Sequence, residues 1–144
     1  MTSGPPRIRL ALILLAAGFT APFAAQAATA TLEPANGSKV KGQVTFIQDG
    51  SRVRAMGEIT GLAPGRHGLQ VQEKGDCNAA DAESAGGKHG GELGNLTASA
   101  SGAATVNSTL SGISIASLMG KGVAVEKSDT SGNAGARVAC GVVK

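Results

Sequence analysis

Glycine and other turn-forming residues divide this chain into short segments, and no window of helical length shows a sustained 3.6-residue period. Glycine accounts for 22 of the 144 residues, and Asp49-Gly50 is the clearest hairpin turn. The segments between the turns are rich in β-branched residues, and several alternate apolar with polar residues. Eight of them are predicted strands: residues 29–33, 40–48, 52–59, 67–73, 96–100, 103–110, 122–127 and 136–143. This pattern favours an all-β fold, either an antiparallel sandwich or a flattened Greek-key barrel.

Residues 1–27 have the pattern of a secretory signal peptide. Arg7 and Arg9 precede an apolar run over residues 10–18, and Ala-Gln-Ala at residues 25–27 is a typical cleavage site. The apolar run is shorter than the roughly 20 residues that cross a bilayer, so we expect no membrane span. We expect cleavage near Ala27, secretion to the periplasm or beyond, and a single mature domain over residues 28–144.

The charge of the expected mature domain disfavours a nucleic-acid partner. Removal of Arg7 and Arg9 with the signal peptide lowers the formal net charge from +3 to +1. The sequence has no Trp, no Tyr and no cluster of Lys or Arg. Nucleic-acid binders present a basic face and stacking aromatic side chains. We therefore expect no nucleic acid among the partners.

Cys77 and Cys140 are the only cysteines, and they lie 63 positions apart. An exported chain meets an oxidising compartment, where an even number of cysteines favours a disulfide over two free buried thiols. The chain-entropy estimate for closing a loop of that length is about 4 kcal/mol. We therefore predict a disulfide between these two residues.

Four motifs resemble the Cu,Zn superoxide dismutase family. Residues 61–77, G-L-A-P-G-R-H-G-L-Q-V-Q-E-K-G-D-C, are similar to its G-L-x-P-G-x-H-G-F-H-V-H-E-x-G-D segment. Residues 84–87 resemble the start of S-A-G-G-H-F-N-P, residues 89–95 resemble H-V-G-D-L-G-N, and residues 131–142 resemble T-G-N-A-G-S-R-L-A-C-G-V. The motifs occur in the family's order and span nearly the whole mature domain. The resemblance implies the family's eight-stranded Greek-key barrel.

The resemblance places other residues at the family's copper ligands. Gln70 and Gln72 correspond to the two histidines of H-V-H, and Val125 corresponds to the histidine of V-V-H-E-K. The metal-bridging histidine of G-G-H-F-N-P has no counterpart, because Gly87 is followed directly by Lys88. An amide oxygen is a weak ligand for copper and Val has no donor atom. We therefore expect no copper at these degenerate positions.

The two glutamines alternate with Val71, so both amides lie on one face of a strand and point outward. We expect this face to be polar and solvated. The alternative is that Gln70, Gln72 and Glu126 form a small hydrogen-bonding site for a ligand.

His89 and Glu92 correspond to two of the family's four zinc ligands, with Glu in place of Asp, and the other two histidines have no counterpart. Asp76, Asp81 or Glu83 would be a further donor. Zinc sites normally take four ligands, commonly several His or Cys. We expect a solvated loop that binds zinc weakly if it binds any, and no other cofactor.

Three further matches have structural interpretations. His67 corresponds to a structural histidine of the family, and Asp129, which matches an aspartate that links metal-binding histidines, is expected to be a turn residue. Arg137 matches the active-site arginine that attracts superoxide beside copper. Without copper we expect it to donate hydrogen bonds to backbone carbonyls and brace the loop of the first cysteine.

The thioethers of Met56 and Met119 suit Cu(I), but two isolated methionines are expected to fill the core.

Three functions are compatible with this pattern. The first is a periplasmic family member without dismutase activity, acting as a binding module for a protein or small ligand, with a homodimer as one arrangement. The second is an active superoxide dismutase with an altered or shared metal site. The third is delivery or storage of copper or zinc, as in the dismutase-like domain of the family's copper chaperone. Metal content after purification distinguishes them.

Overall fold

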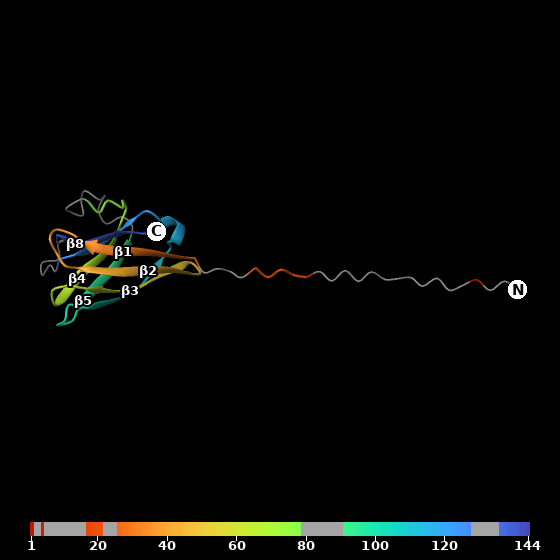
Figure 1. The fold of residues 1–144 in the computed structure, drawn as a ribbon, viewed down its shortest axis with the longest axis horizontal. Coiled ribbons are helices and arrows are strands. Elements are labelled where there is room, and N and C mark those ends of the chain that lie inside the picture. The colour runs from red at the N-terminus through yellow and green to blue at the C-terminus, as the bar shows by residue number, and fades with distance from the viewer. Residues whose placement is uncertain (2–3, 5–16, 22–25, 79–90, 128–135) are drawn as a thin grey trace.

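The computed structural model describes residues 1, 4, 17–21, 26–78, 91–127 and 136–144. Within these ranges eight antiparallel strands and one helical turn form a nearly closed barrel (Figure 1). The elements are β1 (Ala27–Pro34), β2 (Lys41–Asp49), β3 (Arg52–Thr60), β4 (Gly65–Gln72), β5 (Gly91–Ala98), β6 (Ala104–Ser111), α1 (Ile115–Leu118), β7 (Gly122–Glu126) and β8 (Arg137–Val142). The predicted all-β Greek-key barrel is confirmed.

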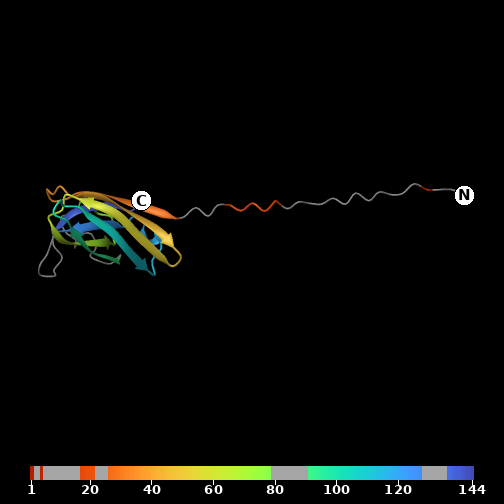
Figure 2. The ribbon, with the colours of Figure 1, turned by 90° about the horizontal axis from the view of Figure 1, so that it is seen from below.

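The strand order is β5-β4-β7-β8-β1-β2-β3-β6. Strand β1 joins the two halves of the sheet, because residues 27–32 pair with β2 whereas Glu33 and Pro34 pair with β8. At the ends of this order, the hydroxyl of Ser108 on β6 donates a hydrogen bond to the carbonyl oxygen of Leu93 on β5. The sheet therefore curves around a common interior, as Figure 2 shows from below.

Alternate residues of the strands fill that interior. Val44 and Phe46 of β2 are 0% exposed, whereas Thr45 and Ile47 between and beyond them are half-buried on the outer face. The other strands contribute aliphatic side chains to the same cluster. Burial of apolar area at about 25 cal/mol per Å² is the main force that holds such a barrel together.

Two glycines show why the backbone needs this residue type. Gly50, in the predicted Asp49-Gly50 hairpin turn, has φ +59°, and the turn joins the Asp49–Arg52 pair at the ends of β2 and β3. Gly57 lies in β3 where a Cβ atom would stand 1.9 Å from the carbonyl oxygen of Gln43. No other residue fits there without moving β2 and β3 apart.

All eight predicted strands are present, and the largest boundary difference is in β5. That strand begins at Gly91, five residues before the predicted start, because Gly91 and Glu92 pair with β4. The turn α1 was not predicted. It is a single turn, capped by Ser114 and held by a hydrogen bond of 2.9 Å from the Ile115 amide to Gln48 Oε1.

The expected cleavage position after Ala27 falls at the first residue of β1. Ala27 pairs with Ile47, and the Gln26 carbonyl accepts a hydrogen bond from the Gln48 amide at 3.0 Å. Among the residues that the structure describes, no helix has the length and apolar character needed to cross a membrane.

Candidate functional site

Gln70 and Gln72 lie on the outward-pointing face of β4, yet both side chains are buried. Leu69 and Val71, which alternate with them, point into the core. Gln70 is 3% exposed and Gln72 is 0% exposed. The expectation of a solvated strand face is therefore wrong, because other groups pack against this face from outside the barrel.

Arg137 is one of the groups that cover this face. It is the first residue of β8 and is only 1% exposed. Its Nη2 donates a hydrogen bond to Gln72 Oε1 at 2.7 Å, and its Nη1 donates to the carbonyl oxygen of Asp76 at 3.0 Å. A guanidinium has several donors in a fixed plane, so it holds β8 against both β4 and the segment before Cys77. The geometry is that of a structural brace.

Val125 is not brought together with the two glutamines. It pairs with Leu69 across β4 and β7, so both side chains share the inner face of the sheet. Val125 is 0% exposed and belongs to the apolar core. The residue that the family motif aligns with the third copper histidine therefore points away from the outer face.

Glu126, the next residue, lies on the outer face instead. It is 4% exposed. A Cβ atom at Gly68 would stand 3.1 Å from Glu126 Oε2 and 3.8 Å from Gln70 Nε2, so both side chains border the space above Gly68. The sequence predicts Glu126 only as a partner of the glutamines. Counting alternate faces from the core residues Val123 and Val125 would have placed it there.

Gln70, Gln72, Glu126 and Arg137 thus form one buried polar cluster, which we call the outer-face cluster. It contains one carboxylate and one guanidinium. Gln70 Oε1 and Gln72 Nε2 are buried and have no hydrogen-bond partner among the described residues. Leaving such a group without a partner costs about 1–3 kcal/mol. Gln70 and Gln72 place amide groups where the family has nitrogen ligands, and Glu126 and Arg137 add a carboxylate and a guanidinium to them.

His67 lies beside this cluster, and its ring nitrogens face backbone carbonyl oxygens. It is 3% exposed, and its Nδ1 and Nε2 lie 3.0 Å and 2.7 Å from the carbonyl oxygens of Glu126 and Ala63. Both ring nitrogens therefore face backbone acceptors that link β4 to β7 and to the preceding turn. This is the geometry of the packed structural histidine that the sequence predicts.

Cys77 and Cys140 form a disulfide, as predicted, with their Cα atoms 5.4 Å apart. Cys140 lies within β8 and is 3% exposed, whereas Cys77 is half-buried. The bond ties the segment that follows β4 to the last strand. Arg137 makes a second tie between the same two parts of the chain.

The structure describes only some of the other residues that the sequence predicts as metal ligands or their neighbours. His89, Asp81, Glu83 and Asp129 lie outside the described residues, as does the side chain of Glu92. Asp76 is exposed, and its Oδ1 accepts a hydrogen bond from the Asn78 amide at 3.1 Å. Among described residues no group of three or more His, Cys, Asp or Glu is placed to hold a metal ion.

The two methionines do not fill the core. Met119 is 50% exposed at the end of α1. Met56 is half-buried on the outer face of β3, where its Sδ lies 3.8 Å from Arg54 Nη2. The prediction of core filling is therefore wrong for both, because each points outward from its element.

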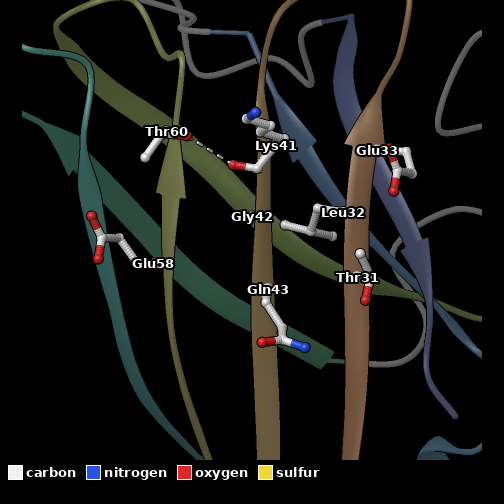
Figure 3. Close-up of a pocket in the computed structure, with 8 residues that line it drawn as sticks. All are labelled: Thr31, Leu32, Glu33, Lys41, Gly42, Gln43, Glu58 and Thr60. Atoms are coloured by element: carbon white, nitrogen blue, oxygen red, sulfur yellow. Dashed lines mark hydrogen bonds between the residues drawn. The ribbon is translucent and has the colours of Figure 1, made fainter.

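Two hollows lie on the outer surface around β1. The first, across β1, β2 and β3, is drawn in Figure 3, where the Thr60 hydroxyl bonds to the Lys41 carbonyl at 3.5 Å. Its lining is Thr31, Leu32, Glu33, Lys41, Gly42, Gln43, Glu58 and Thr60. The second, of about 570 Å³, is lined by Thr29, Thr31, Glu33, Gln43, Cys77, Cys140, Gly141, Val142 and Lys144. The hollows share three residues and therefore adjoin.

Comparison with known proteins agrees with the motifs. The family model described as copper/zinc superoxide dismutase matches residues 40–143. The chain is 36% identical over 141 residues to Cu-Zn superoxide dismutase 2 of Mesembryanthemum crystallinum, covering 74% of this chain and 88% of the relative. It is 33% identical over 138 residues to the extracellular Cu-Zn superoxide dismutase of Haemonchus contortus, covering 75% of each chain. The corresponding protein of Drosophila melanogaster is 33% identical over 138 residues, which cover 74% of this chain and 76% of the relative.

Proposed function

The chain belongs to the Cu,Zn superoxide dismutase family, and from that premise we propose that it is an exported member without dismutase activity that acts as a binding module. One observation carries the proposal. At two positions where the family has imidazole ligands for copper, the outer face of this barrel carries Gln70 and Gln72, while Val125, at the third position, lies in the core. The chemistry of this site, rather than the fold, determines the function, because one fold can serve many functions.

The outer-face cluster does not fit copper. Dismutation needs a metal that cycles between Cu(II) and Cu(I), and imidazole nitrogen accommodates both states better than an amide oxygen does. Gln72 Oε1 already accepts a hydrogen bond from Arg137. A metal ion bound there would displace that bond and stand beside a buried guanidinium, whose charge repels a cation.

The histidines do not compensate for these losses. The chain has two, His67 and His89. His67 directs both ring nitrogens at backbone carbonyls, so a metal at that ring would break a buried hydrogen bond. One remaining imidazole cannot supply the several nitrogen ligands that copper in this family takes. We therefore derive no redox step for this protein.

The binding role is supported by the two adjoining hollows on the outer surface of β1. Thr31, Glu33 and Gln43 line both, and the first also carries Lys41 and Glu58. Hydroxyl, amide and charged groups of both signs suit a polar surface of another protein. We take a protein as the partner.

Export is part of the proposal. The arginines, apolar run and Ala-Gln-Ala site in residues 1–27 support it, and several relatives are named as extracellular dismutases. We expect Ala28 to be the first residue of the protein recovered from the periplasm or the medium. N-terminal sequencing tests this, and recovery of the uncleaved chain in the cytoplasm would contradict it.

The decisive experiment is elemental analysis of the purified mature protein, combined with a superoxide assay before and after loading with copper and zinc. The Mesembryanthemum relative, prepared in parallel, is the positive control. We expect substoichiometric copper and no catalysed dismutation in either state. Activity that scales with copper occupancy and disappears on chelation would establish the altered-site dismutase instead. Copper or zinc that is bound and readily transferred to an acceptor would favour delivery or storage.

Binding is tested with a variant of Thr31, one of the residues that line both hollows. Thr31→Arg introduces a large charged side chain into the lining of both hollows, and Thr109→Arg, on the exposed face of β6, is the matched control. Each immobilised protein is incubated with an exported protein fraction. We expect a partner that the wild type and the control retain and the Thr31 variant loses. Equal retention by all three would show that the hollows are not the binding surface.

A further inference from the structure

The outward-pointing residues of β2 and β3 form one continuous surface, which we call the β2–β3 face. It consists of the odd-numbered residues 41–49 of β2 and the even-numbered residues 52–60 of β3. The residues that alternate with them, such as Val44 and Val53, lie in the core. All charged residues of the face are exposed, and Figure 3 shows the end that carries Lys41 and Glu58. The face is therefore accessible to another molecule.

Two opposite charges on β3 have only uncharged neighbours in the sheet. The cross-strand neighbours of Arg54 and Glu58 on β2 and β6 are Ile47, Thr109, Gln43 and Thr105. Arg54 Nη2 lies 3.8 Å from Met56 Sδ, so the guanidinium extends along β3 toward the Glu58 end of the strand. Opposite charges stabilise a sheet when they lie directly across a strand pair. These two charges therefore contribute little of that kind to the fold of a single molecule.

The charges of β3 are placed symmetrically about the pair formed by Thr45 and Met56, which are partners across β2 and β3. Arg54 lies two residues before Met56, and Glu58 lies two residues after it. At about 3.3 Å per residue, each lies about 7 Å from the pair along the strand. A two-fold axis that crosses both strands at this pair therefore places Arg54 of one molecule opposite Glu58 of another, and the reverse.

Strand β2 has the same relationship. Lys41 and Asp49 lie four residues to either side of Thr45, and they also have opposite charges. Both have an oppositely charged neighbour in the same molecule, because Asp49 is the cross-strand partner of Arg52 and Lys41 lines the first hollow together with Glu33. The pair on β3 therefore supplies most of the charge complementarity.

We propose that the β2–β3 face binds a second copy of this chain, with β3 of one molecule antiparallel to β3 of the other and each Arg54 paired with the partner's Glu58. A two-fold interface brings the same surface of both molecules together, so the favourable pair occurs twice. Thr45 and Met56, which are uncharged and half-buried, lie at its centre, and the charges lie at its rim. The inference rests on the proposed binding function, because Glu58 lines the first hollow and the second copy is the partner of that surface.

The size of the face predicts a weak dimer. At about 4.8 Å between strands and 3.3 Å per residue, β2, β3 and the neighbouring β1 cover roughly 450 Å² of each copy before the relief of the side chains is counted. An interface of about twice that area is at the lower end of specific complexes. We expect a dissociation constant in the micromolar range. It should rise with ionic strength, because salt screens exposed ion pairs.

The first test is sedimentation equilibrium of the purified mature protein, from micromolar to several hundred micromolar concentration. Arg54→Glu and Glu58→Arg should each weaken dimerisation at least about tenfold, because like charges then meet at both symmetric positions. The variant with both substitutions should return to within about threefold of the wild type, because the pair is restored with its signs exchanged. Arg66→Glu and Glu73→Arg make the same charge changes at exposed positions outside the face and should leave dimerisation unchanged.

Three results of this test would overturn the proposal: a wild-type monomer at every concentration, a dimer that both single variants leave intact, or no recovery in the double variant. A wild-type monomer that retains a different exported protein through Thr31 would overturn the second-copy inference and leave the proposed binding function standing. Copper content and the superoxide assay test the absence of dismutase activity independently of the dimer.

The position of the axis is tested by cross-linking. Because packed sheets lie about 10 Å apart, a short bis-maleimide can join two cysteines that face each other at the axis. Met56→Cys should therefore give a cross-linked dimer. Thr60→Cys lies four residues further along β3, so its two copies are about 26 Å apart along the strands and should not be joined. Denaturing electrophoresis and peptide mapping identify the product, and cross-linking at Thr60 that equals or exceeds that at Met56 would overturn the proposed arrangement.

Discussion

Arg137 Nη2 and Gln72 Oε1 form a hydrogen bond of 2.7 Å that joins the first residue of β8 to the last residue of β4. Both residues are at most 1% exposed. The family resemblance assigns one of them to the copper site and the other to substrate attraction. In this chain the two side chains bind each other. The residue at a metal-ligand position of the family therefore takes part in an intramolecular hydrogen bond of the barrel.

We predict that Gln72→Ala destabilises the protein by about 1–3 kcal/mol, because the buried guanidinium loses an acceptor. Gln43→Ala, on the exposed face of β2, should change stability by less than about 0.5 kcal/mol. Urea unfolding followed by circular dichroism measures both values. Equal effects of the two substitutions would show that the Arg137–Gln72 bond contributes little.

The register of β7 leads to a second prediction. Gln70→His, Gln72→His and Glu126→His together should create a copper-binding patch, because all three positions lie on the outer face of the barrel. A matched triple variant with Val125→His in place of Glu126→His should bind copper less well. Its free energy of unfolding should be lower by about 2 kcal/mol or more, because the substitution puts a polar ring into the core. Titration with Cu(II), followed by visible absorption and thermal melts, compares the two. Tighter copper binding by the Val125 variant would contradict the register.

Little dismutation is expected even from the Glu126 triple variant. The metal-bridging histidine of the family has no counterpart in this sequence, and the groups around a metal normally orient and tune its ligands. The superoxide assay of the copper-loaded variant checks this. Rates equal to those of the Mesembryanthemum relative would show that the missing bridge is dispensable.

Loss of the disulfide should lower stability substantially. The bond closes a loop with a sequence separation of 63, for which the chain-entropy estimate is about 4 kcal/mol. Cys77→Ser and the double Cys→Ser variant should both show this loss in urea unfolding. Two free sulfhydryls in the unfolded, unreduced wild type would instead show that the bond does not form in the exported protein.

Zinc binding, where it occurs, is expected to be weak and to depend on His89. Isothermal titration of the wild type and of His89→Ala checks this, with His67→Gln as a comparison at a histidine already bonded to carbonyl groups. Submicromolar affinity that His89→Ala leaves unchanged would place the zinc elsewhere. Loss of binding only in the His67 variant would have the same meaning.

Strand positions could be predicted because they follow local rules. Glycine turns and alternation in segments such as residues 44–47 depend on neighbouring residues only. The outer-face cluster depends on pairing between distant strands. Its members come from β4, β7 and β8, and alternation along β7 places Glu126 rather than Val125 on the outer face, which alignment with the family motif alone does not show.

The burial of Gln70 and Gln72 could not be predicted for a related reason. Alternation determines which side of a sheet a residue occupies, but not whether something covers that side. Gln72 is covered in part by Arg137, which is 65 residues further along the chain. Only the folded arrangement of β4 and β8 brings the two together.

The shared pairing of β1 has a consequence for the order of folding. Glu33 and Pro34 pair with Cys140 and Ala139, and Asn36 Nδ2 donates to the Arg137 carbonyl across a separation of 101 residues. Contacts of this kind slow folding because a long stretch of chain must close before they form. The hairpin of β2 and β3 can form as soon as both strands are available, whereas β1 gains its second partner only after the last residues have arrived. While the last residues are still missing, the edge of β1 that pairs with β8 has no partner. The barrel therefore cannot close until β8 is in place.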